Sequence, residues 1–273
     1  MQIGIFGRTF PGTDPHGVFQ AVKVAGYGAV QHNWASCGLS SIPRYVPSEA
    51  IDATRNAAQI HGLTMAAVSG TANLIHPDLA ARSQEIEGLL EIIRTAPEIG
   101  APVVTLCTGS RDAADRWQAH TDNDSDEAWR DVISAFERLL PEAEAAGVDL
   151  GVEPELANVV NSAQKAQRLI AELGSSRVKI VFDPANLFEV ASLDEQRKII
   201  GDALDCLGPH IAMAHAKDRL AHGSFTTAGK GVLDYPFFLE GLKRVGFDGP
   251  LITHGLRADE APQVATTLRG MLI

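Results

Sequence analysis

The sequence predicts a closed (β/α)₈ barrel, an α/β fold, and three observations lead to this prediction. Eight short apolar runs recur along the 273 residues. Stretches in which apolar residues have helical spacing separate these runs, and a glycine often stands just before the next run. Strands that alternate with helices pair in parallel through right-handed crossovers, and eight such units fit a barrel of roughly 250 residues. We therefore expect one (β/α)₈ barrel domain over residues 1–273.

The predicted strands follow one another at intervals of one strand–helix unit. They are residues 3–6, 29–31, 65–68, 103–107, 150–153, 178–182, 211–215 and 251–253. Helical spacing between them is clearest at Phe136, Leu139 and Leu140. Glycine takes the left-handed conformation of a helix end without steric cost, and Gly62 and Gly147 stand where such ends are expected. The polar stretch of residues 111–126 is expected to be a long loop after the fourth strand.

An open doubly wound sheet is the alternative architecture. Such a sheet usually carries a glycine-rich turn after its first strand, and residues 7–10 (GRTF) do not match that pattern. No linker or low-complexity tract divides the chain. The sequence therefore favours the barrel.

Composition limits the classes of function. The net charge of −11 argues against a general nucleic-acid binder, which needs Lys and Arg to neutralise phosphates. No run of about 18 apolar residues is present, so no membrane span is expected, and the first residues do not resemble a signal peptide. Three cysteines without a C-x-x-C pair indicate reduced thiols. We expect a cytoplasmic protein that contacts neither nucleic acid nor membrane; assembly into a homo-oligomer is left open.

Three chemically active side chains follow successive strands. Glu153 ends the fifth strand, Asp183 follows the sixth and His215 ends the seventh. Functional residues of such barrels lie at these C-terminal strand ends, and neighbouring parallel strands are about 4.8 Å apart. Any one of these residues alone would more often be an independent polar group. Two converging carboxylates and an imidazole instead indicate one divalent metal ion (Mn²⁺, Mg²⁺, Co²⁺ or Zn²⁺).

These residues and their surroundings resemble the xylose-isomerase-like TIM-barrel superfamily, which contains sugar isomerases and epimerases, such as tagatose epimerase, inosose dehydratases and an apurinic-endonuclease branch. The resemblance rests on GVEPE around Glu153, VFDPAN around Asp183 and AHAKD around His215, and covers nearly the whole chain. It extends to residues 69–78 (SGTANLIHPD) and 229–231 (GKG). It implies that Glu153, Asp183 and His215 bind the metal ion.

The eighth strand departs from the pattern of the family. The epimerases usually carry there a Glu that binds the metal ion and moves a proton, whereas this chain has Thr253-His254-Gly255 and no Glu before Glu260. His254 is the nearest substitute, because a neutral imidazole binds the same ions. It serves either as a ligand or acid–base group, or only as a strand-end residue that hydrogen-bonds the backbone.

The predicted activity is that of a metal-dependent isomerase or epimerase, which acts on a sugar or a sugar-derived ketone by proton transfer next to a carbonyl. The candidate catalytic residues are Glu153, Glu155, Lys217 and His254. The candidate residues for binding a small sugar or polyol-derived substrate are His32, Asn73, His76, Asn186, Lys230 and Arg257. Phe10 and Trp34 are candidates for stacking on a sugar ring.

Three other functions remain as alternatives. A metal-dependent lyase, either a dehydratase or an enzyme that eliminates from a keto-glycoside, ranks second because the eighth-strand Glu is missing. A barrel that binds sugar without catalysis would require the metal cluster to be vestigial. The nuclease branch is disfavoured, since its three-zinc cluster needs a His where this chain has Asn186.

Overall fold

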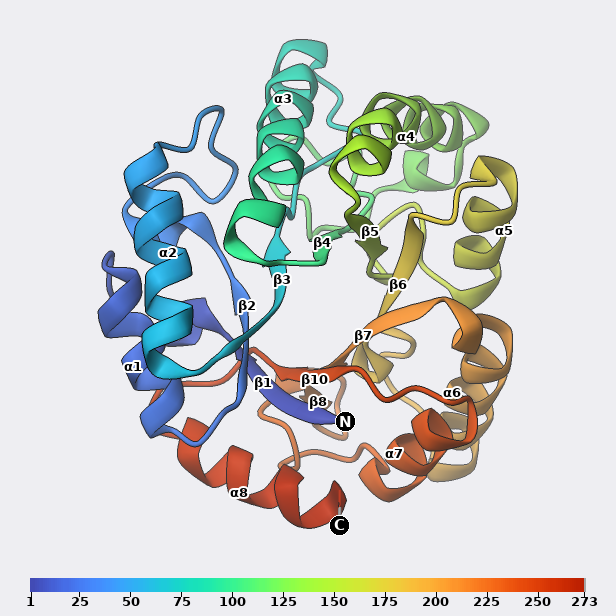
Figure 1. The fold of residues 1–273 in the computed structure, drawn as a ribbon. Helices are drawn as coiled ribbons and strands as arrows, with labels where there is room; N and C mark the ends of the chain where they lie inside the picture. The colour runs from blue at the N-terminus through green and yellow to red at the C-terminus, as the bar shows by residue number, and fades with distance from the viewer. Residues whose placement is uncertain (273) are drawn as a thin grey trace.

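Eight parallel strands form a closed barrel in the computed structural model, which describes residues 1–272 (Figure 1). The strands are β1 (Gln2–Phe6), β2 (Ala29–His32), β3 (Thr64–Ser69), β4 (Val103–Leu106), β5 (Asp149–Val152), β6 (Val178–Phe182), β7 (Ile211–Ala216) and β10 (Pro250–Thr253). They follow one another around the barrel in sequence order, and β10 pairs with β1 to close it. The predicted fold class is confirmed, and each predicted strand overlaps an observed one.

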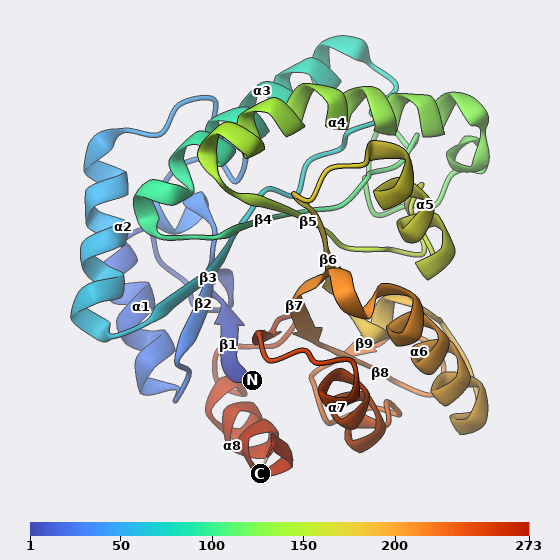
Figure 2. The same ribbon diagram turned by 45° about the vertical axis from the view of Figure 1, so that its right-hand side comes forward.

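Eight α-helices form a ring outside the strands (Figure 1). They are α1 (Pro15–Val24), α2 (Ser48–His61), α3 (Leu79–Thr95), α4 (Asp126–Ala146), α5 (Ala163–Leu173), α6 (Leu193–Leu207), α7 (Tyr235–Arg244) and α8 (Ala261–Leu272). Gly62 and Gly147 end α2 and α4 in the left-handed conformation, as the sequence predicts. Figure 2 shows α3 and α4 side by side along one flank of the barrel. No helix among residues 1–272 has the length and apolar character needed to cross a membrane.

The barrel interior is filled by small and apolar side chains. Ala29, Val103, Val181 and Met213 pack together there as buried neighbours. The space is tight: a Cβ atom on Gly151 would lie 2.8 Å from the Val103 side chain. Side chains alternate along a strand, so the residue two positions beyond each of these points into the same interior, nearer its C-terminal end. The alternation therefore aims one side chain from each strand at the functional end.

A short hairpin follows β7 and consists of β8 (Asp218–Arg219) and β9 (Phe225–Thr226). The buried Asp218 carboxylate accepts hydrogen bonds from the backbone N–H groups of Gly229, Gly231 and Leu233 at 2.9–3.1 Å. This carboxylate fixes the loop that leads to α7. The AHAKD sequence thus supplies a structural anchor next to β7.

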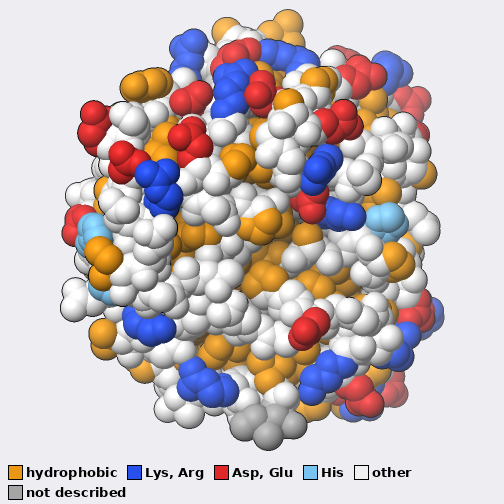
Figure 3. Space-filling model, viewed as in Figure 1, with side chains coloured by type: hydrophobic (Ala, Val, Ile, Leu, Met, Phe, Trp, Pro, Cys, Tyr) orange, Lys and Arg blue, Asp and Glu red, His pale blue; other side chains and the backbone are white. Residues whose placement is uncertain are grey.

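The loop predicted after β4 spans residues 107–125 and is fixed by side-chain contacts. Asn123 donates to the Ala157 carbonyl at 2.8 Å and accepts from the Arg111 N–H at 2.8 Å. Arg116 forms an ion pair with Glu85 of α3 at 2.9 Å. On the face of the molecule seen in Figure 3, charged side chains lie mainly around the rim and hydrophobic ones toward the middle.

Candidate metal centre and active site

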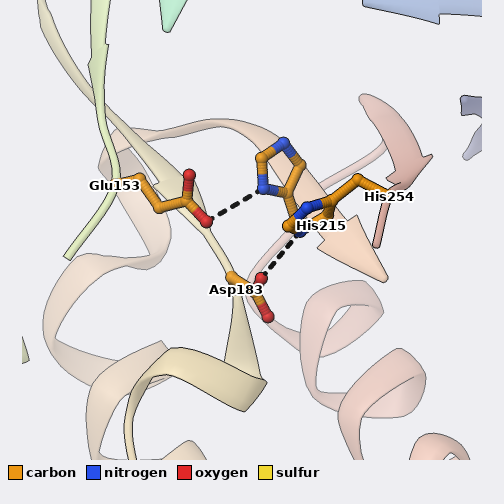
Figure 4. A group of neighbouring side chains, drawn as sticks. All are labelled: Glu153, Asp183, His215 and His254. Carbon is orange, nitrogen blue, oxygen red and sulfur yellow. Dashed lines mark hydrogen bonds and ion pairs between the residues drawn. The ribbon is translucent and has the colours of Figure 1, made fainter. Parts of the chain in front are cut away.

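Four candidate ligands meet at the C-terminal end of the barrel. Glu153 directly follows β5, Asp183 follows β6, His215 lies in β7 and His254 directly follows β10. Figure 4 shows the four side chains pointing toward one another. One ligand atom from each lies within 4.8 Å of the others. The cluster therefore joins the three predicted ligands and the candidate fourth, His254.

The cluster consists of two carboxylate–imidazole pairs. Glu153 Oε1 lies 3.0 Å from His215 Nδ1, and Asp183 Oδ2 lies 3.0 Å from His254 Nε2. The two imidazole rings lie 4.3 Å apart between their centroids. Each pair brings a carboxylate oxygen against a ring nitrogen, so either a proton or a cation must lie between them.

A single divalent ion fits this arrangement. Two ligand atoms about 2.1 Å from one ion, and at right angles to each other, would be about 3.0 Å apart. Both carboxylate–imidazole distances have this value. Two carboxylates and two imidazoles form a mixed oxygen and nitrogen donor set that suits divalent first-row ions. The chemistry of the donor set therefore suits a divalent ion, and the two close pairs have the spacing of adjacent ligands on one ion.

A hydrogen-bond chain behind His215 sets the state of its ring. The Gln31 amide nitrogen donates to Thr105 Oγ1 at 3.0 Å, and Gln31 Oε1 faces His215 Nε2 at 2.9 Å. An amide oxygen only accepts, so His215 Nε2 carries the hydrogen. The nitrogen nearest Glu153, Nδ1, then keeps its lone pair for a cation, as in many metal-binding histidines.

The charges of the cluster also favour a cation. Burial alone raises the pKa of Asp183, but nearby Lys217 and His254 outweigh it and hold that pKa well below its ordinary value. Burial likewise opposes ionisation of Glu153, yet His215 lowers the pKa of Glu153 overall. Burial, together with the positive charge of Lys217, lowers the pKa of His254. Ionised carboxylates and a neutral imidazole are the forms that bind metal.

Three further polar residues surround the cluster. Lys217 Nζ donates to Asn186 Oδ1 at 2.8 Å, and Asn186 Nδ2 donates to Glu153 Oε1 at 2.8 Å. The same ammonium lies 3.5 Å from Asp183 and 4.0 Å from Glu155. Burial, and then the negative charge of Glu153, raise the pKa of Glu155 to about 8 against the opposing effect of Lys217. These residues form a charged network beside the candidate metal ligands.

The cluster opens into a cavity of about 760 Å³, which is within the range typical of small-molecule sites, about 300–1,000 Å³. Its lining includes Glu153, His215 and His254 from the cluster, with Glu155 and Lys217 beside them. Aromatic and aliphatic side chains complete the walls: Phe6, Trp117, Leu156 and Phe225. The cavity therefore presents charged groups and apolar surfaces to the same ligand.

Two of the predicted substrate-binding residues lie in the protein interior and do not line the cavity. The His32 ring is fully buried and packs edge-on against Phe19 and Trp34. Asn73 is also buried, and its amide exchanges hydrogen bonds with the Ser110 backbone at 2.9 and 3.1 Å. The described contacts of both side chains are structural.

Three other candidates hold loops outside the cavity. His76 contacts backbone atoms of the turn before α3 and of the loop after β4. Lys230 pairs with Glu260 at 2.5 Å, and Arg257 pairs with Asp259 at 2.7 Å. Among the proposed substrate-binding residues, only Asn186 touches the cluster.

Phe10 and Trp34, considered for sugar stacking, are core residues with 7% and 0% exposure. Many cavity-lining residues were not in the sequence-based set, among them Gln31, Trp117 and Phe225. The strand alternation could have found Gln31, because it lies two residues beyond the interior Ala29. Trp117 and Phe225 lie in long connections, where no periodicity predicts which side chain turns inward.

The sequence was compared with protein families and with curated proteins. The model of the xylose isomerase-like TIM barrel family matches residues 19–272. No curated protein matches the sequence.

Solved structures share the fold at low sequence identity. 3-Keto-D-glucoside 4-epimerase YcjR from E. coli is 17% identical, with a TM-score of 0.78 and 99% of both chains covered. D-psicose 3-epimerase from Clostridium cellulolyticum H10, solved with D-tagatose, is 16% identical, with a TM-score of 0.76 over 100% of this chain and 99% of its own. IolI, solved with a zinc atom, is 17% identical, with a TM-score of 0.74 over 100% and 98%. At these identities the likeness concerns the fold.

Proposed function

The chain belongs to the xylose isomerase-like TIM barrel family, and from this premise we propose that it is a metal-dependent isomerase or epimerase of a sugar or sugar-derived ketone. The observation that carries the proposal is the cluster of Glu153, Asp183, His215 and His254 at the wall of a substrate-sized cavity. Structures with the same fold include enzymes named as sugar epimerases, which supports a carbohydrate substrate.

In this proposal Glu153, Asp183, His215 and His254 hold one divalent ion. When bound, such an ion orients vicinal oxygens and polarises a carbonyl, which makes the adjacent C–H group more acidic. Gln31 keeps His215 in the tautomer that leaves Nδ1 free. Asn186 holds Glu153 in place through its amide hydrogen bond.

The residues next to the cluster supply proton transfer and charge stabilisation. Glu155 faces the cavity, and its ionised form takes the proton from the carbon next to the carbonyl; a pKa of about 8 places this ionisation near neutral pH. The Lys217 ammonium stabilises the negative charge that develops on the oxygen. Return of the proton by Glu155 to the former carbonyl carbon, with transfer of the proton of the adjacent hydroxyl to the former carbonyl oxygen, gives an isomer. Epimerisation instead requires delivery from the opposite face, for which His254 on the β10 side is the candidate.

A lyase is the second candidate, and a specific observation favours it. The carboxylates that line the cavity are Glu153, Glu155 and Glu189, and none of them comes from β10. If His254 serves as a ligand, Glu155 is the base that remains next to the cluster, because Glu189 is exposed in the connection after β6. One base suffices to remove a proton and eliminate a β-substituent, whereas two opposed groups are needed to invert a carbon.

Isotope incorporation distinguishes these reactions. The metal-loaded enzyme is incubated in D₂O with a panel of ketoses, keto-inositols and keto-glycosides. Deuterium in an isomer of otherwise unchanged mass supports isomerisation or epimerisation, and loss of water or an aglycone supports elimination. Absence of exchange and of product from the whole panel, with each of Mn²⁺, Mg²⁺, Co²⁺ and Zn²⁺, contradicts the proposed function.

Two variants locate the base. Glu155→Gln is expected to lower deuterium incorporation by about 100-fold or more, because general-base catalysis typically contributes that much. Its metal content should remain that of the wild type. Glu240→Gln, an exposed change of the same type on α7, serves as the control and is expected to leave the rate unchanged. Equal rates for Glu155→Gln and the control contradict the role of Glu155.

A further inference from the structure

A second cavity, of about 600 Å³, adjoins the one at the metal cluster. Phe6, Ser69, Thr71 and Trp117 belong to the walls of both. The second cavity extends from this shared wall toward the segment between β2 and α2 and toward the first turns of α3. The two hollows are thus neighbouring compartments of one cleft, with Trp117 at their junction.

The junction is held in place by contacts that do not depend on a ligand. Arg116 binds Glu85 of α3 through both terminal nitrogens, at 2.9 and 3.1 Å, and donates to the Thr71 carbonyl at 2.6 Å. The backbone N–H of Trp117 donates to Asp115 Oδ1 at 2.9 Å. The Trp117 side chain nevertheless remains 49% exposed. An aromatic ring that is half exposed between two hollows, on a backbone held in place, provides a surface for the apolar face of a ligand.

The second cavity differs from the first in its chemistry. Beyond the shared wall, hydroxyl, amide and guanidinium groups predominate: Asn33, Ser40, Ser41, Arg44 and Gln84. Among residues 1–272, the exposed side chains of Ser41, Arg44 and Gln84 form no hydrogen bond or ion pair with other protein groups. None of the candidate metal ligands reaches this compartment. It therefore offers hydrogen-bonding groups for recognition and no catalytic cluster.

We propose that this second cavity is a subsite for a second sugar unit, so that the substrate is a glycoside and not a free monosaccharide. The inference rests on the proposed function: the ketone-bearing unit occupies the metal end, and its neighbour lies beyond Trp117. Unpaired hydroxyl and amide groups match the many hydroxyls of a sugar better than an apolar aglycone. Phe6 and Trp117 supply the aromatic wall between the two units.

The test compares sugars of two sizes on the metal-loaded enzyme. Isothermal titration calorimetry measures the affinity for fructose and for three fructose-containing disaccharides: lactulose, turanose and isomaltulose. These disaccharides carry their second sugar at different positions of the fructose unit. At least one disaccharide is expected to bind about tenfold more tightly than fructose, because even two or three net hydrogen bonds give a gain of this size. Equal or weaker binding of all three disaccharides overturns the proposal.

Two matched variants test whether the tighter binding of the disaccharide comes from the second cavity. Gln84→Trp fills the second cavity, and Ser83→Trp adds the same bulk at the neighbouring exposed position of α3, which does not line it. Gln84→Trp should reduce the affinity of the preferred disaccharide to that of fructose and leave fructose binding unchanged, whereas Ser83→Trp should leave both unchanged. A disaccharide preference that survives Gln84→Trp overturns the placement of the subsite.

Deuterium exchange on the same samples distinguishes failure of the second subsite from failure of the proposed function. Exchange into fructose without any disaccharide preference overturns the second subsite alone. Absence of both sugar binding and exchange overturns the subsite together with the proposed function.

Discussion

Replacement of His32 by Leu should remove a large part of the acid sensitivity of the fold. The ring is fully buried between Phe19 and Trp34, and its Nδ1 atom has no hydrogen-bond partner among the described residues. Burial lowers the pKa of His32 from 6.5 to about 3. The folded protein therefore keeps this imidazole neutral in mildly acidic solution.

The magnitude follows from the two pKa values. As the pH falls through 6.5, the unfolded chain takes up a proton on His32, whereas the folded chain does not until about pH 3. The lowered pKa of His32 therefore does not change the free energy of unfolding above pH 6.5, and it reduces that free energy as the pH falls below 6.5. Each pH unit costs about 1.4 kcal/mol, so lowering the pH from 6.5 to about 5 costs about 2 kcal/mol at this one residue.

Urea unfolding at pH 7 and at about pH 5 measures this contribution. The free energy of unfolding of the wild type should fall by about 2 kcal/mol more than that of His32→Leu. His222→Leu removes an exposed histidine and is the control; it should behave as the wild type. Equal losses in His32→Leu and the wild type would refute the account of a buried, neutral ring.

Three further predictions concern the hydrogen-bond partner of His215, a loop glycine and a helix glycine. Gln31→Leu should weaken metal binding by about 10–100-fold, the usual effect of losing a hydrogen-bond partner behind a ligating His. Gln31→Glu keeps an acceptor for His215 Nε2 and should bind the metal more tightly than Gln31→Leu. Metal titration measures both affinities. Gly231→Ala places a Cβ atom 2.1 Å from the Arg219 carbonyl oxygen and should destabilise the fold by about 1–3 kcal/mol in urea unfolding. Gly270→Ala, at a helical position where the added Cβ meets no atom of residues 1–272 within 4 Å apart from its own helix backbone and chain neighbours, should instead be neutral or stabilise by up to about 1 kcal/mol.

The cluster could be predicted from the sequence because barrel geometry decides it. A residue at the C-terminal end of a parallel strand faces the functional end, whatever the lengths of the intervening helices. Glu153, Asp183 and His215 are 30 and 32 residues apart, one strand–helix unit each time. The same geometry makes His254, at the end of the last strand, a candidate. The centroid of its ring lies 4.3 Å from that of His215.

Strand alternation explains one residue that the prediction missed. The sequence drew attention to His32 as the polar residue at the end of the second strand. The barrel interior receives Ala29 and therefore Gln31, while His32 points outward into the packing between β2 and α1. A shift of one position exchanges a cavity residue for a core residue.

Loop residues could not be predicted in the same way. Lys230 and Arg257 lie in the connections after β7 and β10, and each pairs with an acidic residue at the surface. Trp117 lies in the long connection after β4, and its position depends on the ion pair between Arg116 and Glu85 of α3. Contacts between segments distant in sequence set these positions, and no local pattern records them.

Metal stoichiometry decides whether Glu153, Asp183, His215 and His254 form a metal centre. Elemental analysis of protein equilibrated with Mn²⁺, Mg²⁺, Co²⁺ or Zn²⁺ should find one tightly bound ion per wild-type chain for at least one of these metals. Asp183→Asn and Glu153→Gln should each lose that ion, and Glu155→Gln, next to the cluster, should retain it. A wild type without bound metal, or metal content unchanged in both Asp183→Asn and Glu153→Gln, would contradict the assignment of this cluster as the metal centre.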